Sequence, residues 1–383
     1  MEAVREYIKN RKSPVCAYIY DLPGVKKRAE TMKAGLPGHC RLYYAVKANP
    51  DPEIIRTLEP VVDGFEIASG GEMDRTWNGP RIFGGPSKKE EEVRRALEDP
   101  DMLLNVESFQ DLRRMAYLAG KEDRTANVLL RVNLKEDVSG SRLKMSGVPT
   151  QFGVEEEWMP SLIEEALASP HISIQGFHFH AMSNNLDAGV HVAFAELAVR
   201  KALQWQEAYA LDTSLIDLGG GFGINYWNPE EPFDWDTFAQ GVTEIDTKGH
   251  ELILEVGRYM TGDSGFYVTE VVDVKENHGQ AFAVVRGGTH HLRFPAAWKI
   301  SQPFYVVAKD EWEYPFARPG VENTEVVIAG ELCTPNDLLV RGDYVESLRA
   351  GDTVVFTQAG AYAWTISHHD FLSHPHPEFV YIR

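Results

Sequence analysis

Short apolar runs alternate with helix-like segments through the first two thirds of this 383-residue chain, and no other feature constrains the fold as strongly. The runs lie at Arg41–Lys47, Asp63–Ala68, Arg81–Phe83, Leu103–Val106, Asn127–Val132, Ile172–His180, Leu215–Leu218 and Glu251–Glu255. Helical patterns lie between most of them, at Lys88–Glu98, Phe109–Ala119, Trp158–Ala168 and Val190–Tyr209. Strands that alternate with helices, with this count of strands, predict an α/β fold of the (β/α)8 TIM-barrel type.

The chain changes character after about residue 265, where strands follow one another with little helical pattern between them. These strands are expected at Phe266–Val274, Gln280–Val285, Phe304–Val307, Glu325–Ile328, Thr353–Phe356 and Phe379–Ile382. They predict a separate C-terminal β-barrel or sandwich domain, which agrees with a length beyond that of most single cores. An early strand-like run, Val15–Tyr20, could belong to either domain.

Charge and cysteine content exclude several classes of partner. A formal net charge of −19 disfavours nucleic acid and anionic membranes as general partners. Three cysteines (Cys16, Cys40 and Cys333) provide neither a disulfide framework nor zinc-ligand spacing, so we expect a reducing compartment, the cytoplasm. The N-terminus lacks the pattern of a secretion signal, and the chain has no apolar run long enough for a membrane helix.

Lys47 ends the apolar run Tyr43-Tyr44-Ala45-Val46-Lys47, an unusual place for an ammonium group. A buried lysine must form an ion pair, lower its pKa or become a covalent anchor, and a lowered pKa suits a lysine that forms a Schiff base. The alternative is a lysine whose side chain leaves the strand and reaches solvent.

Other functional residue types also end predicted barrel strands, where the active site of such a barrel lies. Glu66 ends the second strand and His180 the sixth, while Gly219–Gly223 after the seventh could bind a phosphate with backbone N–H groups. The eighth ends Glu255-Val256-Gly257-Arg258, which supplies a carboxylate for a pyridine nitrogen and a guanidinium for a phosphate. Singly these residues could form an ion pair or a tight turn; jointly they indicate pyridoxal 5′-phosphate.

Seven motifs in order resemble the fold-type III pyridoxal-phosphate decarboxylases, which include the diaminopimelate, ornithine and arginine decarboxylases. They are Tyr44–Asn49, Gly64–Glu72, His178–Ser183, Asp217–Gly223, Glu255–Arg258, Gly330–Cys333 and Gly360–Tyr362. The resemblance implies that Lys47 binds the cofactor covalently and that His180 stacks on its ring. It implies further cofactor contacts from Glu66, Ser183, Gly220, Gly221, Gly223, Glu255, Gly257, Arg258 and Tyr362.

The resemblance also implies a two-domain organisation and an assembly. Residues 25–265 would form the cofactor-binding barrel, and residues 1–24 and 266–383 the β-domain, because the family's β-domain takes in the N-terminal strand. A head-to-tail homodimer would place Cys333 of one subunit at the cofactor of the other. Cys333 is then the candidate proton donor, although a free cysteine is more often a small core residue, the role expected for Cys16 and Cys40. Glu255 would keep the pyridine nitrogen protonated, which favours decarboxylation.

The substrate-binding motifs depart from the best-known relatives. Thr334 follows Cys333 where diaminopimelate and ornithine decarboxylases carry a carboxylate, although Asp337 remains at a later acidic position. His290, His291 and Arg293 would suit an anionic or hydroxyl-rich distal group, or could form a solvated turn. The Cys-Thr-Pro motif resembles a subgroup of siderophore pathways, and predicts decarboxylation of a conjugated amino acid such as citryl-L-2,3-diaminopropionate. Diaminopimelate decarboxylase is the alternative.

Three other interpretations are weaker. A racemase of this family would carry an arginine in place of Glu255, and a non-catalytic regulator would be free to lose Lys47 or Arg258. The C-terminal His368-His369 and His374-Pro375-His376 lack the accompanying ligands of a metal site, so we expect no metal and place these histidines near the surface or the substrate mouth. Whether the loop Asp137–Thr150 closes over the site is open.

Overall fold

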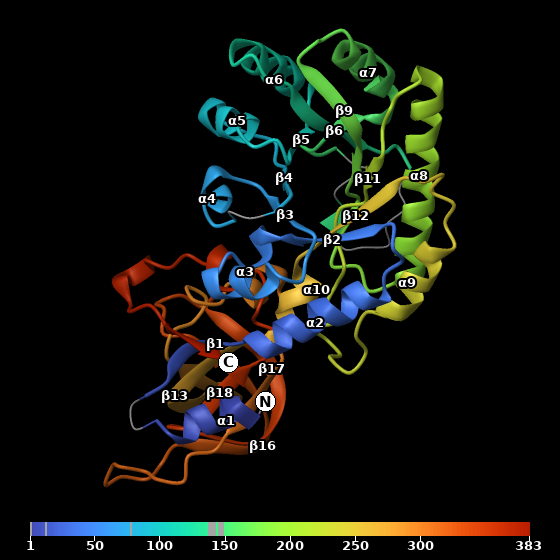
Figure 1. The fold of residues 1–383 in the computed structure, drawn as a ribbon. Helices are drawn as coiled ribbons and strands as arrows, with labels where there is room; N and C mark the ends of the chain where they lie inside the picture. Colours follow the sequence, from blue (N-terminus) through green and yellow to red (C-terminus); the bar gives the residue numbers. More distant parts are fainter. Residues whose placement is uncertain (1, 12–13, 77–78, 137–142, 145–148) are drawn as a thin grey trace. The chain divides into compact units, whose positions relative to one another are not determined.

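The computed structural model describes residues 2–11, 14–76, 79–136 and 149–383, together with the backbone of Leu143–Lys144. The chain divides into two compact units, and Figure 1 shows the elements of each. One unit comprises Lys26–Ile224 and Pro232–Met260. The other comprises Met1–Val25, Asn225–Glu231 and Thr261–Arg383. Among the described residues, no helix has the length and apolar character needed to cross a lipid bilayer.

The first unit is a closed barrel of parallel strands, so the predicted fold class is confirmed. Its eight strands are β2 (Cys40–Ala45), β3 (Gly64–Ile67), β4 (Arg81–Phe83), β5 (Met102–Val106), β6 (Ala126–Asn133), β9 (Ile172–Phe179), β11 (Leu215–Asp217) and β12 (Glu251–Val256). Each pairs with the next, and β12 pairs with β2. Each strand is a short, largely apolar run, as expected where both faces of a parallel sheet are covered.

Helices connect these strands and lie outside the barrel in Figure 1. They are α2 (Leu22–Gly35), α3 (Pro52–Leu58), α4 (Gly70–Met73), α5 (Glu90–Leu97), α6 (Phe109–Lys121), α7 (Met159–Leu167), α8 (Ala188–Tyr209), α9 (Trp235–Thr243) and α10 (Arg258–Thr261). Side-chain caps begin several of them: Ser108 Oγ accepts from Asp111 N–H before α6, and Asp187 Oδ1 accepts from Val190 N–H before α8. Short pieces complete the unit: strands β7 (Leu143–Lys144), β8 (Val154–Glu155) and β10 (Met182–Ser183), and the 3-10 turns η1 (Val46–Ala48) and η2 (Glu156–Trp158).

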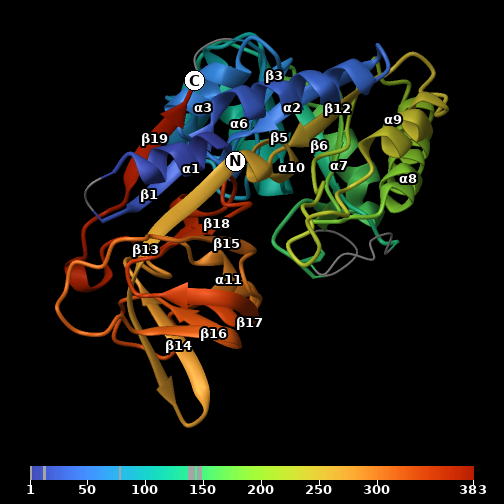
Figure 2. The ribbon, with the colours of Figure 1, turned by 90° about the horizontal axis from the view of Figure 1, so that it is seen from below.

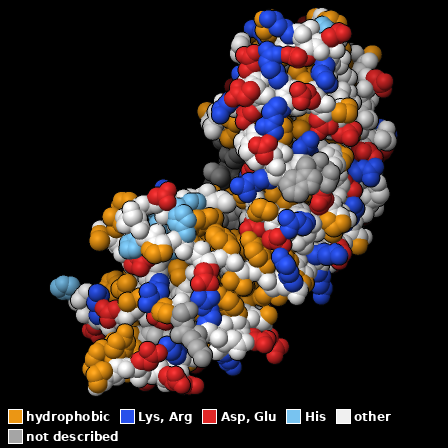
Figure 3. Space-filling model, turned by 60° about the vertical axis from the view of Figure 1, so that its left-hand side comes forward, with side chains coloured by type: hydrophobic (Ala, Val, Ile, Leu, Met, Phe, Trp, Pro, Cys, Tyr) orange, Lys and Arg blue, Asp and Glu red, His pale blue; other side chains and the backbone are white. Residues whose placement is uncertain are grey.

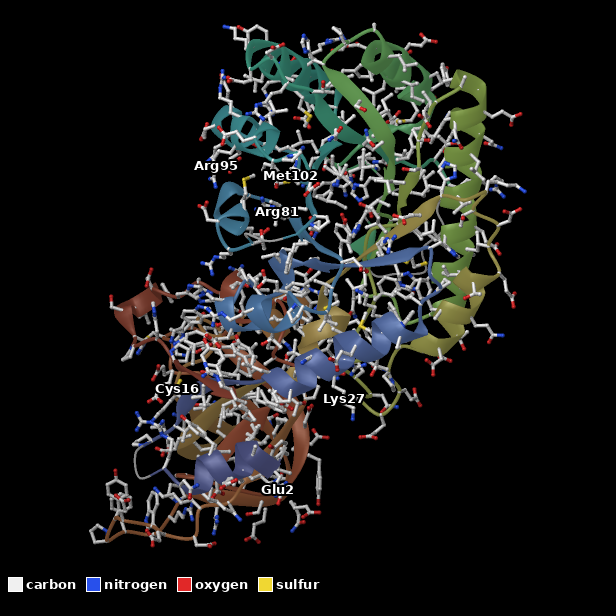
Figure 4. The ribbon with its side chains drawn as sticks, in the orientation of Figure 1. Glu2, Cys16, Lys27, Arg81, Arg95 and Met102 are labelled. Carbon is white, nitrogen blue, oxygen red and sulfur yellow. The ribbon has the colours of Figure 1, made fainter. Side chains whose placement is uncertain are left out.

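The opposite ends of the barrel strands have different chemistry. Figure 4 labels Arg81 and Met102, which are register partners where β4 and β5 begin. At this N-terminal end of the strands, Arg81 forms an ion pair with Asp99 at 2.5 Å, which we interpret as a structural contact. Four buried strand residues, Tyr43, Ile82, Leu129 and Ile253, form an apolar cluster that holds barrel strands together. The functional residues must therefore be sought at the C-terminal ends of the strands.

The second unit is built on an eight-stranded mixed sheet. Its strands are β1 (Cys16–Asp21), β13 (Gly265–Asn277), β14 (Gln280–Val285), β15 (Phe304–Val307), β16 (Gly320–Ala329), β17 (Leu338–Arg349), β18 (Thr353–Phe356) and β19 (Glu378–Ile382). Figure 2 shows β14, β16 and β17 side by side, in agreement with their pairing. Helices α1 (Glu2–Lys9) and α11 (Phe294–Trp298) and the 3-10 turns η3 (Gly262–Ser264), η4 (Trp364–Ile366) and η5 (Phe371–Ser373) complete it.

The N-terminal strand β1 joins the C-terminal strands. It pairs with β13 in antiparallel and with β19 in parallel orientation. Figure 4 places Cys16, the first residue of β1, within this unit. Val15, Ile19, Phe266, Val268 and Val355 share its buried core with the α1 residue Val4. Strand β1 therefore pairs and packs with segments that are far from it in the sequence.

Candidate active site

Lys47 lies just beyond a barrel strand. Strand β2 ends at Ala45, so Lys47 occupies the turn η1 and not the strand end that the sequence predicts. Its Nζ donates a hydrogen bond to Glu66 Oε2 at 2.8 Å. The side chain of Lys47 is 39% exposed, whereas that of Glu66 is 5% exposed. Lys47 therefore combines an ion pair to a buried carboxylate with access from solvent.

Strand register and one glycine position this lysine. Ala45 is the register partner of Glu66 across the parallel pair β2 and β3, which brings Lys47 and Glu66 to the same barrel end. A Cβ on Gly257 would lie 2.8 Å from the Cβ of Ala48, so glycine lets the end of β12 approach the turn that carries Lys47. Arg258 follows directly and is buried.

Glu255 is buried in β12 beside two histidine rings. Its Oε2 lies 3.7 Å from His178 Nε2 and 3.9 Å from His180 Nδ1. Burial raises the pKa of Glu255 well above the usual carboxyl value and lowers the pKa of both histidines well below the usual imidazole value. The backbone N–H of Gly220 donates to His180 Nδ1 at 3.1 Å, so that nitrogen carries no proton. Both rings are therefore neutral at physiological pH.

The loop Gly219–Gly223 needs glycine at several of its positions. Gly221 has a φ of +98°, in the left-handed region, and a Cβ there would lie 2.6 Å from Met182 O. A Cβ on Gly220 would lie 2.3 Å from Glu255 O. Only glycine permits this path, which keeps the backbone of the loop against β12.

Ser183 lies beside the glycine loop. Its neighbour Asn185 donates its N–H to Gly221 O at 2.8 Å, and Gly223 N–H donates to Asn185 O at 2.9 Å. These two bonds tie the segment after β9 to the loop after β11. The structure therefore places His180 and the segment that contains Ser183 beside the glycines.

Cys333 and Tyr362 belong to the second unit. Cys333 is a free, exposed thiol in the turn between β16 and β17. Tyr362 is half-buried with a φ of +50°, a left-handed conformation that is rare for an aromatic residue. Cys40, in contrast, is buried, and burial raises the pKa of its thiol to about 12, so it is not a reactive thiolate.

A cavity of about 450 Å³ in the second unit receives part of the predicted substrate-binding set. It is lined by Thr289, Arg293, Ala296, Ala297, Thr334, Asn336, His368 and Phe371. Burial and the nearby Arg293 guanidinium lower the pKa of His368, and His368 Nδ1 is buried with no hydrogen-bond partner among the described residues. The described lining thus holds one arginine, one histidine and several neutral polar groups, without a carboxylate.

Three residues predicted to contact substrate are placed elsewhere. Asp337 is buried; its two oxygens accept from Thr289 N–H at 2.6 Å and Leu332 N–H at 2.8 Å, so it holds the loops that shape the cavity. His290 and His291 are fully buried and do not line the cavity. Polar neighbours accompany these buried side chains: His291 Nδ1 lies 3.0 Å from Tyr267 Oη, His290 Nε2 lies 3.8 Å from Glu331 Oε1, and backbone N–H groups satisfy Asp337. Spacing along the chain does not reveal these contacts.

The C-terminal histidines lie at the surface of this unit, where Figure 3 shows histidine side chains gathered on one face. His369 stacks on Trp364 with ring centroids 3.6 Å apart, and His376 Nε2 lies 3.2 Å from Asp370 Oδ1. Only His368 reaches the cavity. The other open question, the loop Asp137–Thr150, falls mostly on residues 137–142 and 145–148, outside the described residues.

Several buried polar residues in the barrel were not singled out from the sequence. Asp217 is fully buried at the end of β11. Arg131 forms a buried ion pair with Glu107 at 2.7 Å, and His178 stands beside Glu255. A charged or polar side chain inside an otherwise apolar strand could have identified these residues in the sequence. Such a side chain needs a polar partner when the strand is buried.

Comparisons with known proteins agree with this geometry. A family model described as "Pyridoxal-dependent decarboxylase, pyridoxal binding domain" matches residues 22–262. The "2-[(L-alanin-3-ylcarbamoyl)methyl]-2-hydroxybutanedioate decarboxylase" of Staphylococcus aureus is 40% identical over 390 residues, which cover 100% of this chain and 98% of that protein. A diaminopimelate decarboxylase of Campylobacter jejuni is 28% identical and covers 91% of this chain and 86% of its own length.

The fold has a close counterpart among solved structures. The diaminopimelate decarboxylase of Helicobacter pylori, complexed with L-lysine, superposes with a TM-score of 0.87 at 24% identity, covering 99% of this chain and 94% of that one. With the fold, the strand-end residues and the family match in agreement, the chain belongs to the pyridoxal-dependent decarboxylases, carboxy-lyases that use pyridoxal 5′-phosphate on amino-acid-derived substrates.

Proposed function

We propose that this enzyme removes the α-carboxylate of an amino acid whose side chain is joined to a polycarboxylic acid, with citryl-L-2,3-diaminopropionate as the model substrate. The observation that carries the proposal is the cavity beside the Cys333–Thr334 turn. Arg293 and His368 line it, and no described lining residue is acidic. Such a lining favours carboxylate and hydroxyl groups and disfavours the free distal ammonium of diaminopimelate. The name of the 40% identical relative describes a substrate of this conjugated kind, which supports the proposal. We propose that the reaction belongs to the assembly of a carboxylate siderophore.

The barrel residues fit pyridoxal 5′-phosphate. Lys47 offers an amine with solvent access, and the loop Gly219–Gly223 has glycines at positions where a Cβ would clash with neighbouring atoms. We assign the phosphate to this loop with Ser183 and Arg258, the ring face to His180, and the ring nitrogen to Glu255. The phosphate contact of Tyr362, a residue of the other unit, stays a prediction. Glu66 keeps Lys47 oriented.

We assign His178, His180 and Glu255 to the cofactor ring and not to a metal ion, although their ligand atoms lie within 4.8 Å of one another. The His180 nitrogen nearest to Glu255 already accepts the Gly220 N–H, so its lone pair is used. The bound cofactor supplies an electron sink for the electron pair that the departing carboxylate leaves behind. Glu255 supports that sink by holding negative charge at the ring nitrogen.

Cys333 is our candidate for the thiol that returns a proton to the α-carbon, and we propose that it acts across a homodimer. Its exposure in the β-domain unit supports this role, since a thiol committed to the core could not reach a substrate. Mixing Lys47→Ala protein with Cys333→Ala protein should restore activity, because one of the two shared sites is then complete. If mixed dimers form and remain as inactive as the separate variants, the shared-site proposal fails.

We retain domain limits of 25–265 for the barrel and of 1–24 with 266–383 for the β-domain, supported by the pairing of β1 with β13 and β19. The structural units depart from these limits at Val25, at Asn225–Glu231 and at residues 261–265, all of which cluster with the β-domain. We also propose a cytoplasmic enzyme. The support is chemical: the cysteines are free thiols, as reducing conditions keep them.

The decisive assay compares carbon dioxide release by the purified enzyme from citryl-L-2,3-diaminopropionate and from meso-diaminopimelate. We expect the higher kcat/KM with the conjugated substrate. A higher value with diaminopimelate would support the alternative that the 28% identical relative represents. Exchange of the α-hydrogen with deuterium in the absence of carbon dioxide release would indicate a racemase instead.

A further inference from the structure

Asp217 is a buried carboxylate without a role in the site as described above. It ends β11 and has no exposed surface. Its Oδ1 accepts the N–H of Gly219 at 2.8 Å, whereas its Oδ2 is buried with no hydrogen-bond partner among the described residues. Glu255 also lacks a hydrogen-bond partner for one carboxylate oxygen, because its Oε1 is buried and has none among the described residues. An unpaired carboxylate oxygen is costly in a protein interior, so two of them require an explanation.

The two carboxyl groups come from neighbouring strands. Asp217 is the register partner of Ile253 across β11 and β12, and Glu255 lies two residues further on, on the same face of its strand. Glu255 N–H also donates to Gly219 O at 2.8 Å, which fixes the two strand ends together. Each carboxyl group also acts on the pKa of the other, as near neighbours do. Two ionised carboxylates in such positions repel each other, and a proton on one of them replaces the repulsion with a hydrogen bond.

We propose that Asp217 and Glu255 share one proton between Asp217 Oδ2 and Glu255 Oε1, which makes Asp217 the positioning residue of Glu255. One proton satisfies both unpartnered oxygens and leaves the pair with a single negative charge. Glu255 Oε2, on the side of His178 and His180, stays available to the cofactor. This inference rests on the proposed contact of Glu255 with the ring nitrogen, and not on the identity of the substrate.

The surrounding charges are consistent with a proton on this pair. The negative charge of Glu66 favours retention of the proton, whereas the positive charges of Lys47 and Arg131 favour its loss. His178 and His180 face the pair as neutral rings and supply no positive charge.

Burial is the largest influence on both carboxyl groups. It raises the pKa of Asp217 to about 7 and that of Glu255 well above the usual value. The pair titrates as a unit, like other buried carboxyl pairs that share a proton.

Infrared spectroscopy of the full-length enzyme, with and without cofactor, tests the proposal. At slightly acidic pH the wild type should show the C=O band of a protonated carboxyl group. Asp217→Asn and Glu255→Gln should each lose it, because the new amide N–H replaces the shared proton and leaves a single ionised carboxylate. Asp212→Asn, which changes an exposed aspartate just before β11, should keep the band. A wild type without the band, or a band that survives in both amide variants, would overturn the proposal.

The pH dependence of unfolding gives a second readout that does not depend on activity. Asp217 has a raised pKa in the folded state, so its contribution to stability is complete below about pH 4 and is lost as the pH rises through about 7. In the cofactor-free wild type, one such proton changes the unfolding equilibrium constant by up to about tenfold per pH unit in this window. Comparing the pH dependence of unfolding between wild type and Asp217→Asn isolates the contribution of this proton, because both proteins contain the same buried histidines. Identical pH profiles for the two proteins would refute a shared proton, while the decarboxylation assay would stand unaffected.

Discussion

At the level of single residues, the pairing of Lys47 with Glu66 links cofactor attachment to stability. Lys47→Ala should abolish covalent binding of pyridoxal phosphate, and should cost about 1–3 kcal/mol of unfolding free energy because the buried Glu66 loses its cation. Mass spectrometry after borohydride reduction measures the first effect, and urea unfolding the second. Lys26→Ala is a suitable control, since the Lys26–Glu30 pair is exposed. Cofactor mass retained on Lys47→Ala would contradict the assignment.

At the level of single residues, we also expect Arg293 and His368 to determine the substrate preference. Removing one charge-assisted hydrogen bond costs about 1.5–3 kcal/mol, so Arg293→Gln should raise KM for the conjugated substrate by about 10- to 100-fold. His368→Asn should act in the same direction with a smaller effect. Arg113→Gln provides the control, because Arg113 is exposed on α6, pairs with Glu165 and is not part of the cavity lining. An unchanged KM in Arg293→Gln would show that the cavity does not bind the substrate.

At the level of elements, the approach of neighbouring barrel strands depends on a glycine inside β9. A Cβ on Gly176 would lie 1.8 Å from Leu215 O, where β9 pairs with β11. Gly176→Ala should therefore destabilise the barrel by about 1–3 kcal/mol or more, because the strands that carry His180 and Asp217 must separate. Thermal unfolding checks this, with Gly38→Ala as the control, since a Cβ on Gly38 meets no atom within 4 Å. Equal melting temperatures for both variants would contradict the packing argument.

Element prediction succeeded where the pattern was local and failed where it was not. Every predicted barrel strand overlaps an observed one, because a parallel strand covered on both faces is a continuous apolar run. Strand β17 (Leu338–Arg349) was missed: its run is broken by Gly342 and carries charged residues such as Arg341 and Asp343. It is nevertheless a long strand, because it pairs with β16 along most of its length and the ladder overrides a weak local preference.

For the molecule as a whole, buried neutral histidines set the response to acid. Burial lowers the pKa of His191 from 6.5 to about 3, and His178 and His180 are lowered as well. A histidine with a lowered folded-state pKa contributes stability above about pH 6.5 that is lost as the pH falls toward the folded value. His191 stacks on Phe222 at 4.2 Å, so His191→Phe should fit and should weaken acid unfolding between about pH 6 and pH 3.

Unfolding free energies measured across this pH range test the effect of His191. His278→Asn is the matched control, because His278 is exposed and asparagine tolerates its φ of +53°. We expect the unfolding free energy to fall less steeply with decreasing pH in His191→Phe than in wild type, and His278→Asn to match the wild type. A profile that matches the wild type would show that His191 does not govern acid stability.

The sequence by itself determined the barrel, the cofactor and the reaction class. Those properties reside in local patterns: strand and helix periodicity, and the lysine, histidine, glycine and carboxylate residues at or just beyond the ends of individual strands. Only the tertiary structure decided which side chains face which space. It turned His290, His291 and Asp337 inward, brought His368 to Arg293, and placed Asp217 and Glu255 on neighbouring strands. These outcomes depend on burial and on contacts between segments far apart in the chain, which no local pattern specifies.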